Sequence, residues 1–153
     1  MNFIVDMRNG DRKDLIEGCI TLFMRELKMA RTKGELVVST VKNFQRDKGC
    51  AGMVYPYSKD VVLMDLDSRL PLERLVEVIA HEMVHVKQIL KGELIYKGKK
   101  IYWKKKLINP KKISYYEHPW EIDAWSKEKI LASRVWLKLE QAGIIDKVAH
   151  GLS

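Results

Sequence analysis

The stretch His81-Glu82-Met83-Val84-His85 lies inside an apolar run from Leu70 to Leu90 and decides both the fold and the chemistry expected of this chain. Two histidines four residues apart project from the same face of a helix, because four residues make just over one turn. Two imidazole nitrogens at this spacing can hold one tetrahedral zinc ion. Glu82 leans toward the same ion, where its carboxylate can take a proton from a water whose pKa zinc lowers to about 7. The pattern predicts a zinc site with a general base beside it.

The helix that carries this pattern is expected to lie in the middle of the protein. Its apolar residues recur at steps of three and four, and three more widen the stripe: Leu72, Leu75, Val76, Ile79, Met83, Val86 and Leu90, with Val78, Val84 and Ile89. The alternative is a pair of helix histidines that serve only as core or surface residues. Two buried histidines and a buried glutamate need polar partners, and a metal ion supplies them, so the zinc interpretation is favoured.

Length and composition predict one domain over residues 1–153, with the hydrophobic content of a globular protein. Residues 1–14 lack the pattern of a signal peptide, and no apolar stretch approaches membrane-spanning length. Cys19 and Cys50 lie far apart, which excludes a disulfide framework and a Cys-x-x-Cys zinc site. We expect each cysteine to be a small buried residue, and the protein to be cytoplasmic with no membrane contact.

The formal net charge of +8 is concentrated in one segment. Residues 97–112 hold eight lysines next to Tyr96, Tyr102 and Trp103: Lys97, Lys99, Lys100, Lys104, Lys105, Lys106, Lys111 and Lys112. Lysines mixed with aromatic residues are typical of nucleic-acid surfaces, so a weak nucleic-acid contact is one interpretation. The favoured one is a solvated hairpin whose lysines protect its edges from aggregation, since no other feature indicates a nucleic-acid module.

The remaining patterns predict an α+β fold. A helix begins at Asp11 and ends before Gly34, and three strands follow at Leu36–Val41, Ala51–Tyr57 and Val61–Leu66. The short connections between these strands predict a small, mainly antiparallel sheet. After the central helix we expect a hairpin over residues 94–103, a long helix from Pro119 to Gly143, and a short helix over residues 144–149.

A zinc ion held by two histidines needs at least one more protein ligand. The candidates downstream are Glu117, His118, Glu121, Asp123 and His150. Glu121 is preferred, because in the first turn of the second long helix it can point back at the two histidines across a helix contact. His118 is the rival, since imidazole is a good ligand and Pro119 fixes the chain beside it. We expect His150 to be a surface residue.

With these residues in place, the chain resembles small intracellular metallopeptidases of the gluzincin type. The resemblance covers residues 61–133 and rests on His81–His85, on Tyr115-Tyr116 and on the stretch Pro119–Ala124. Within that group, the chain is similar to SprT-like and ImmA-type proteases and to compact metallopeptidases often carried by bacteriophages. The resemblance implies a zincin-like fold, with the sheet packed on the motif helix between N-terminal and C-terminal helices. It also implies Glu121 as the third ligand of Zn²⁺, and an edge strand, here Val61–Leu66, that binds extended peptide.

The chain departs from this family at one position near the metal. Gluzincins that have an aspartate four residues after the ligand glutamate use it to orient a zinc histidine, and here that position is Trp125. Asp123 or a backbone carbonyl is the expected substitute. The cysteine ribbon of longer SprT-like proteins is also missing from the sequence, as is the type of DNA-binding domain that some ImmA-like proteins carry.

The expected activity is hydrolysis of peptide bonds in a protein or peptide substrate. Glu82 takes the proton of the zinc-activated water and later passes it to the leaving amine. Tyr115, Tyr116 or His118 can supply a hydrogen bond to the developing oxyanion, although packing is an equal interpretation of the tyrosines. The alternatives are a regulatory protease with one partner, or a zinc-stabilised module that binds nucleic acid or protein through residues 97–112 without turnover. Glu82 argues against the last, because a structural zinc needs no base.

Overall fold

The structure of the protein is a computed structural model, which describes residues 1–150. It is an α+β fold, as predicted, with two sheets and five α-helices in that range. In chain order the elements are β1 (Asn2–Asp6), α1 (Asp11–Glu26), β2 (Glu35–Val41), α2 (Phe44–Lys48), β3 (Gly52–Ser58), β4 (Val61–Asp67), α3 (Leu72–Leu90), β5 (Leu94–Lys97), β6 (Lys100–Trp103), β7 (Lys106–Ile108), the 3₁₀ turns η1 (Pro110–Lys112) and η2 (Tyr115–Glu117), α4 (Pro119–Gln141) and α5 (Ile144–His150).

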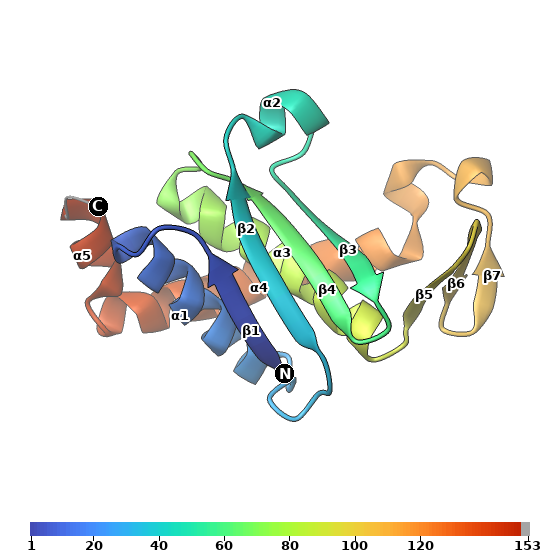
Figure 1. Cartoon of the computed structure of the whole chain (residues 1–153), viewed down its shortest axis with the longest axis horizontal. Coiled ribbons are helices and arrows are strands. Elements are labelled where there is room, and N and C mark those ends of the chain that lie inside the picture. Colours follow the sequence, from blue (N-terminus) through green and yellow to red (C-terminus); the bar gives the residue numbers. More distant parts are fainter. Residues whose placement is uncertain (151–153) are drawn as a thin grey trace.

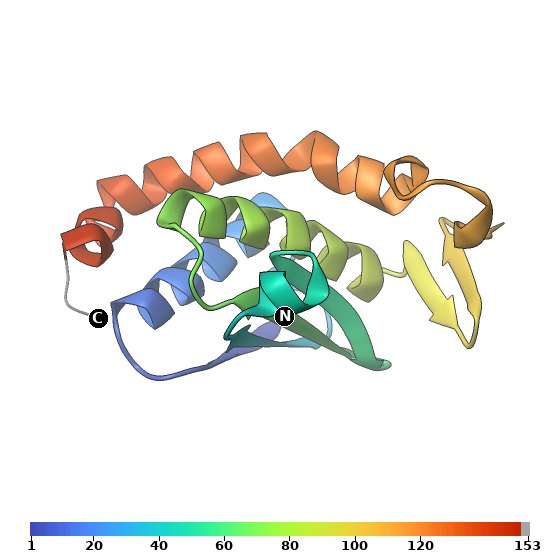
Figure 2. The ribbon, with the colours of Figure 1, turned by 90° about the horizontal axis from the view of Figure 1, so that it is seen from above.

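The elements form three layers with a small sheet at one end (Figures 1 and 2). The four-stranded sheet β1-β2-β4-β3 forms one outer layer, α1 and α3 lie against one of its faces, and α4 crosses the far side of α3 (Figure 2). The three-stranded sheet β5-β6-β7 lies beyond the C-terminal end of α3, away from β1 (Figure 1). This arrangement leaves α3 between the large sheet and α4.

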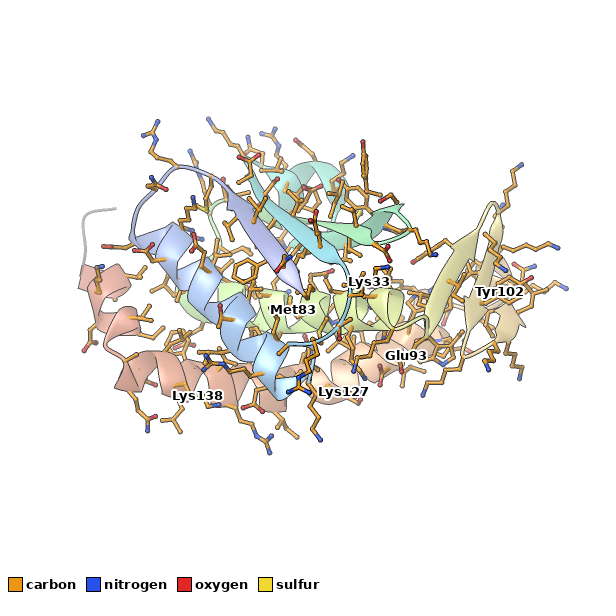
Figure 3. All side chains as sticks on the ribbon, turned by 60° about the horizontal axis from the view of Figure 1, so that its bottom comes forward. Lys33, Met83, Glu93, Tyr102, Lys127 and Lys138 are labelled. Atoms are coloured by element: carbon orange, nitrogen blue, oxygen red, sulfur yellow. The ribbon has the colours of Figure 1, made fainter. Side chains whose placement is uncertain are left out.

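The helix α3 is buried on nearly every side, because its apolar residues are not confined to one stripe. Its buried apolar residues are Leu75, Val76, Val78, Ile79, Ala80, Met83, Val84 and Val86. Alternate residues of the central strands belong to the same core, among them Leu36, Val38, Val62, Met64 and Leu66, all fully buried. Met83, in the middle of the histidine pattern, sits at the centre of this core (Figure 3).

The large sheet is mixed, so the prediction of a mainly antiparallel sheet is wrong. β1 pairs with β2 and β2 with β4 in parallel, and only β3 and β4 are antiparallel. The helix α1 forms the crossover between β1 and β2, and the connection over residues 42–51 contains α2 and carries the chain past the place that β4 occupies. β4 is therefore an inner strand, and β3 is the edge strand in place of the expected Val61–Leu66.

Two residues of β3 explain its place at the edge of the sheet and close to α3. Pro56 has no backbone N–H to donate, which suits a strand with one unpaired side, and the pairing with β4 shifts between Pro56 and Ser58. Gly52 lies against α3, where an added Cβ would approach Val78 Cγ1 to 2.8 Å. The start of β3 is thus held close to the helix that carries the histidines.

Asp67, at the end of β4, fixes the connection above the sheet. Its carboxylate accepts hydrogen bonds from the backbone N–H of Gln45 in α2 (2.8 Å) and of Arg69 (2.9 Å). These two backbone bonds lower the pKa of Asp67 below its usual range, despite its low exposure. One buried carboxylate thereby joins α2, β4 and the turn that leads into α3.

Element boundaries agree with most predictions and correct others. α1 ends at Glu26 and not near Gly34, since Lys28 adopts a φ of 57° and turns the chain. The expected hairpin is present as β5 and β6, and β7 adds a third strand that was not predicted; β1 and α2 were also missed. No helix within the described residues is long and apolar enough to cross a membrane.

Candidate metal centre

His81, His85 and Glu121 bring three ligand atoms together between α3 and α4. Glu121 Oε1 lies 2.9 Å from His81 Nε2 and 3.0 Å from His85 Nε2, and the two nitrogens are 3.2 Å apart. The histidines share a face of α3, and Glu121 is in the first turn of α4, the helix packed on that face. These are the three metal ligands predicted from the sequence, and the group could hold a metal ion.

Gln88, one turn after His85, orients the ring of His85 from behind. Gln88 is fully buried, and its Nε2 donates to the carbonyl of Trp120 (2.9 Å) and to Asp123 Oδ2 (2.9 Å). Both partners can only accept, so the amide orientation is fixed and Gln88 Oε1 faces His85 Nδ1 at 2.8 Å. The Nδ1 must then carry the hydrogen, which leaves the Nε2 of the neutral ring with a free lone pair.

Glu128 is the corresponding neighbour of His81, at a longer distance. Its Oε2 lies 3.5 Å from His81 Nδ1, two helical turns after Glu121 on α4. A carboxylate beside Nδ1 favours the tautomer with hydrogen at that nitrogen. The neutral histidines therefore direct two bare nitrogens at a carboxylate oxygen, all within 2.9–3.2 Å.

Three facing acceptors repel one another unless a cation lies among them, so the donor set fits a bound metal.

The charges at this centre are strongly coupled. When a proton on an imidazole takes the place of the cation, burial still raises the pKa of Glu121, but the hydrogen bonds and charges of His81 and His85 outweigh burial and lower it to about 2. Burial opposes charge on His85, and the contacts with Glu121 outweigh it, so the pKa of His85 is raised. Glu121 is consequently an anion at neutral pH, ready to bind a cation.

Glu82 is the neighbour of this centre that remains without a hydrogen-bond donor. It is 7% exposed, and no group within the described residues donates to its carboxylate. Burial raises the pKa of Glu82, and the charges of His85 and His81 offset part of that effect. A buried, basic carboxylate that borders an open hollow has the properties of a general base.

The other candidate ligands do not join the group. His118 Nε2 lies 3.1 Å from the carbonyl of Pro110, which can only accept, so this nitrogen is protonated and turned away from the metal ligands. Asp123 pairs with Lys127 at 2.7 Å and with Gln88, and Glu117 accepts from Ser114. The side chain of His150 is outside the described residues.

Two adjoining hollows run past the metal ligands and form one cleft. One, of about 290 Å³, has a polar wall with Gln45, Arg74 and Glu128. The other, of about 390 Å³, has a mainly apolar wall: Met53, Val54, Ile89, Leu94, Tyr96 and Trp120. His81, Glu82 and the start of β3 border both. An extended chain lying in this cleft would pass directly over the candidate base.

Cys50 borders both hollows and is half-buried, so the expectation of a buried apolar residue is correct for Cys19 and wrong here. Burial and the charge of Glu82 raise the pKa of the Cys50 thiol, which keeps it protonated. It is therefore a neutral part of the cleft wall.

The two tyrosines predicted to assist catalysis occupy different places. Tyr115 borders both hollows, and burial together with the charge of Glu121 raises its pKa to about 12, so the phenol keeps its proton. Tyr116 is 76% exposed and its ring lies 5.7 Å from that of Trp125, outside the lining of either hollow. Trp125 fills the turn between Glu121 and Glu128, its ring 6.3 Å from that of His81.

Sequence reasoning missed Gln88 and Glu128, the two residues that orient the imidazoles. The expected substitute, Asp123, reaches His85 only through Gln88. Spacing could have indicated both residues, since Gln88 lies three residues after His85 and Glu128 seven after Glu121, on the same helix faces.

Comparison of the chain with protein-family models, with curated proteins and with solved structures finds no match. The chemistry of the site must therefore be argued from its own residues.

Proposed function

We propose that the protein is a zinc-dependent endopeptidase with a zincin-like fold and a gluzincin-type site. The observation that carries the proposal is the arrangement of His81, His85 and Glu121, three acceptor atoms that face one another and need a cation. A buried carboxylate, Glu82, lies beside them in an open cleft. A metal with a neighbouring base and an accessible cleft is the constellation of a hydrolase.

When bound, the zinc ion would supply a Lewis acid that acidifies water and polarises a carbonyl. His81, His85 and Glu121 would hold it, while Gln88 and Glu128 keep both rings in the tautomer that binds metal. Glu82 would accept the proton of the attacking water and deliver it to the nitrogen of the leaving amine. The raised pKa of Glu82 suits both transfers, because the carboxylate must hold the proton between them.

The cleft offers a peptide two means of orientation. Among the residues that the structure describes, β3 pairs with β4 alone, so its other edge could pair with an extended chain, and the cleft lies along the start of this strand. Tyr115, with its proton retained at neutral pH, would donate a hydrogen bond to the oxygen of the attacked carbonyl. Tyr116 lies outside the lining of both hollows and is given no such role.

A metal analysis tests the ligands. We expect about one zinc per chain in the wild type, and its loss in Glu121→Ala but not in His118→Ala, because the His118 Nε2 is bonded to Pro110. Zinc retained by Glu121→Ala, or lost only with His118→Ala, would contradict the ligand set.

A second experiment tests the chemistry. Glu82→Gln should keep its zinc and lose nearly all cleavage of denatured protein substrates, a drop of about 10²–10⁴-fold. Normal cleavage by this variant would exclude Glu82 as the base.

The alternative function is a zinc-stabilised module that binds without turnover. The concentration of lysines in residues 97–112 favours it, and salt-dependent binding to DNA without cleavage of any protein would support it. The position of Glu82 supports the enzyme, since a structural zinc gains nothing from a buried carboxylate placed beside its ligands.

A further inference from the structure

The small sheet β5-β6-β7 and the turn after it carry the whole net charge of the protein. Residues 94–112 contain eight lysines and no arginine, aspartate or glutamate, while the rest of the chain has 20 basic and 20 acidic residues. All eight lysines are exposed. Tyr102 marks this end of the molecule in Figure 3, where nitrogen-tipped side chains project away from the body. We call residues 94–112 the basic sheet.

The lysines of the basic sheet have no acidic partners within the described residues, unlike several basic side chains elsewhere. Lys87, Lys127 and Lys138 each lie within 4.0 Å of a carboxylate, whereas none of the eight does. Their charge is consequently free to act on another molecule.

The charge surrounds a shallow hollow and is not spread evenly. Lys99, Lys100 and Lys111 border a depression of about 340 Å³, whose floor contains Leu107, Ile108 and Pro110. Three ammonium groups around an apolar floor provide contacts for carboxylates and for the aliphatic parts of a peptide.

The basic sheet begins at the wall of the cleft. Leu94 and Tyr96 of β5 line the apolar hollow beside the candidate ligands, and the next residue, Lys97, pairs with Lys100 at the turn of the hairpin, on the opposite face of the sheet. A second connection runs through Pro110, whose carbonyl accepts from His118. The His118 ring lies 4.8 Å from that of Trp120 and 5.8 Å from that of Tyr115, both in the cleft wall.

We propose that the basic sheet is a binding surface for an acidic segment of the protein substrate, on one side of the bond that is cut. This inference rests on the proposed endopeptidase function and specifies its substrate class. The other end of the cleft contains Arg74 and Glu128, which carry charges of opposite sign. Acidic substrate residues on that side of the bond therefore gain no net electrostatic attraction. The selectivity is therefore directional.

An acidic peptide fits this surface better than a nucleic acid. Single strands stack their bases on free aromatic faces. Here strand pairing places Tyr102 on one face of the sheet and Tyr96 with Trp103 on the other. The ammonium groups of Lys97 and Lys104 already lie 5.9 and 5.2 Å from the ring centres of Tyr102 and Trp103. No face offers a row of free rings, whereas all the ammonium groups are accessible.

Binding to the zinc-loaded, full-length Glu82→Gln protein tests the inference without turnover. The probes are fluorescein-labelled peptides that share a neutral core. One carries a run of glutamates before the core and one carries the run after it, and in the control peptides glutamines replace the glutamates. We expect glutamates on one side to tighten binding about tenfold at low salt, and the gain to vanish at high salt. Equal binding of all peptides, or an equal gain on both sides, would overturn the inference.

Charge reversal locates the surface. Lys100→Glu with Lys111→Glu should abolish the gain in binding that the glutamates give, with the zinc content unchanged. Lys42→Glu with Lys129→Glu, an equal change at exposed lysines outside the basic sheet, should keep most of it. A gain that survives the first pair, or a single-stranded DNA that binds more tightly than the glutamate peptide, would overturn the inference.

Cleavage separates the two proposals. Wild-type enzyme that cuts the glutamine peptides supports the endopeptidase whatever the glutamates do. Selective binding of glutamates without any cleavage would refute the endopeptidase and retain an acidic partner for this surface.

Discussion

Replacing Gln88 by methionine tests the reasoning on which the metal centre depends. Methionine has a similar volume, so it leaves little cavity, but it neither donates nor accepts a strong hydrogen bond. The His85 Nδ1–H would lose its partner inside the protein, while the Trp120 carbonyl would keep its place in the hydrogen bonds of α4 and Asp123 would keep Lys127.

The size of the effect follows from this one group. A buried polar group left without a partner costs about 1–3 kcal/mol, so we expect the free energy of unfolding of the metal-free Gln88→Met protein to fall by about 1–3 kcal/mol. Release of the His85 ring should weaken zinc binding by about 10–100-fold, which corresponds to about 1.4–2.7 kcal/mol. Urea unfolding measures the first quantity, and competition with a chromophoric chelator measures the second.

Two further variants distinguish orientation of the ring from general stability. Leu139→Ala removes a buried side chain of α4 at a cost of about 2–5 kcal/mol and touches none of the ligands, so zinc affinity should stay normal. Gln88→Glu keeps an acceptor for His85 but loses both donors, so stability should fall while much of the zinc affinity remains. If Gln88→Met bound zinc as tightly as the wild type, the role assigned to Gln88 would be refuted.

Three other predictions concern the cleft and the sheet. Tyr115→Phe should lower the rate of peptide cleavage by about 10–10³-fold with zinc content unchanged, whereas an unaltered rate would assign Tyr115 to packing. Gly52→Ala should cost about 1–3 kcal/mol in urea unfolding, because its Cβ would lie 2.8 Å from Val78 Cγ1; no loss would mean that β3 can shift. Asp67 has a lowered pKa in the fold, so its contribution is complete above its unfolded pKa of about 3.9 and is lost as the pH falls through the folded value. Asp67→Asn should accordingly cost about 1–2 kcal/mol at pH 7 and less in acid, and an equal cost at both pH values would exclude the carboxylate as the cause.

The elements themselves were largely predictable, because their signals are local. Pro119 and Gly143 bracket α4, and the apolar pattern defines α3 to within two residues of its bounds. The pairing of the strands was not predictable from local signals, since it depends on contacts between distant segments and on the path of the connections. Pro56 was the one local sign that its strand lies at an edge, and the helix between the first two strands was the sign of a parallel pair.

The ligands were predictable for a related reason. Once α4 packs on α3, only residues on the inner face of α4 can reach the histidines, and the helical period places Glu121 there together with Ala124 and Glu128. His118 precedes the first turn with an extended backbone, and its ring bonds Pro110, so its better chemistry as a ligand does not compensate for its position. Glu128 lies on the same face, but almost one turn beyond Trp125, the position at which a carboxylate partner for a zinc histidine was expected. The choice of ligand was thus decided by helix geometry, which the sequence encodes. The hydrogen bond that prepares His85 runs through Gln88 to the opposite helix, and that contact became visible only when the two helices were placed together.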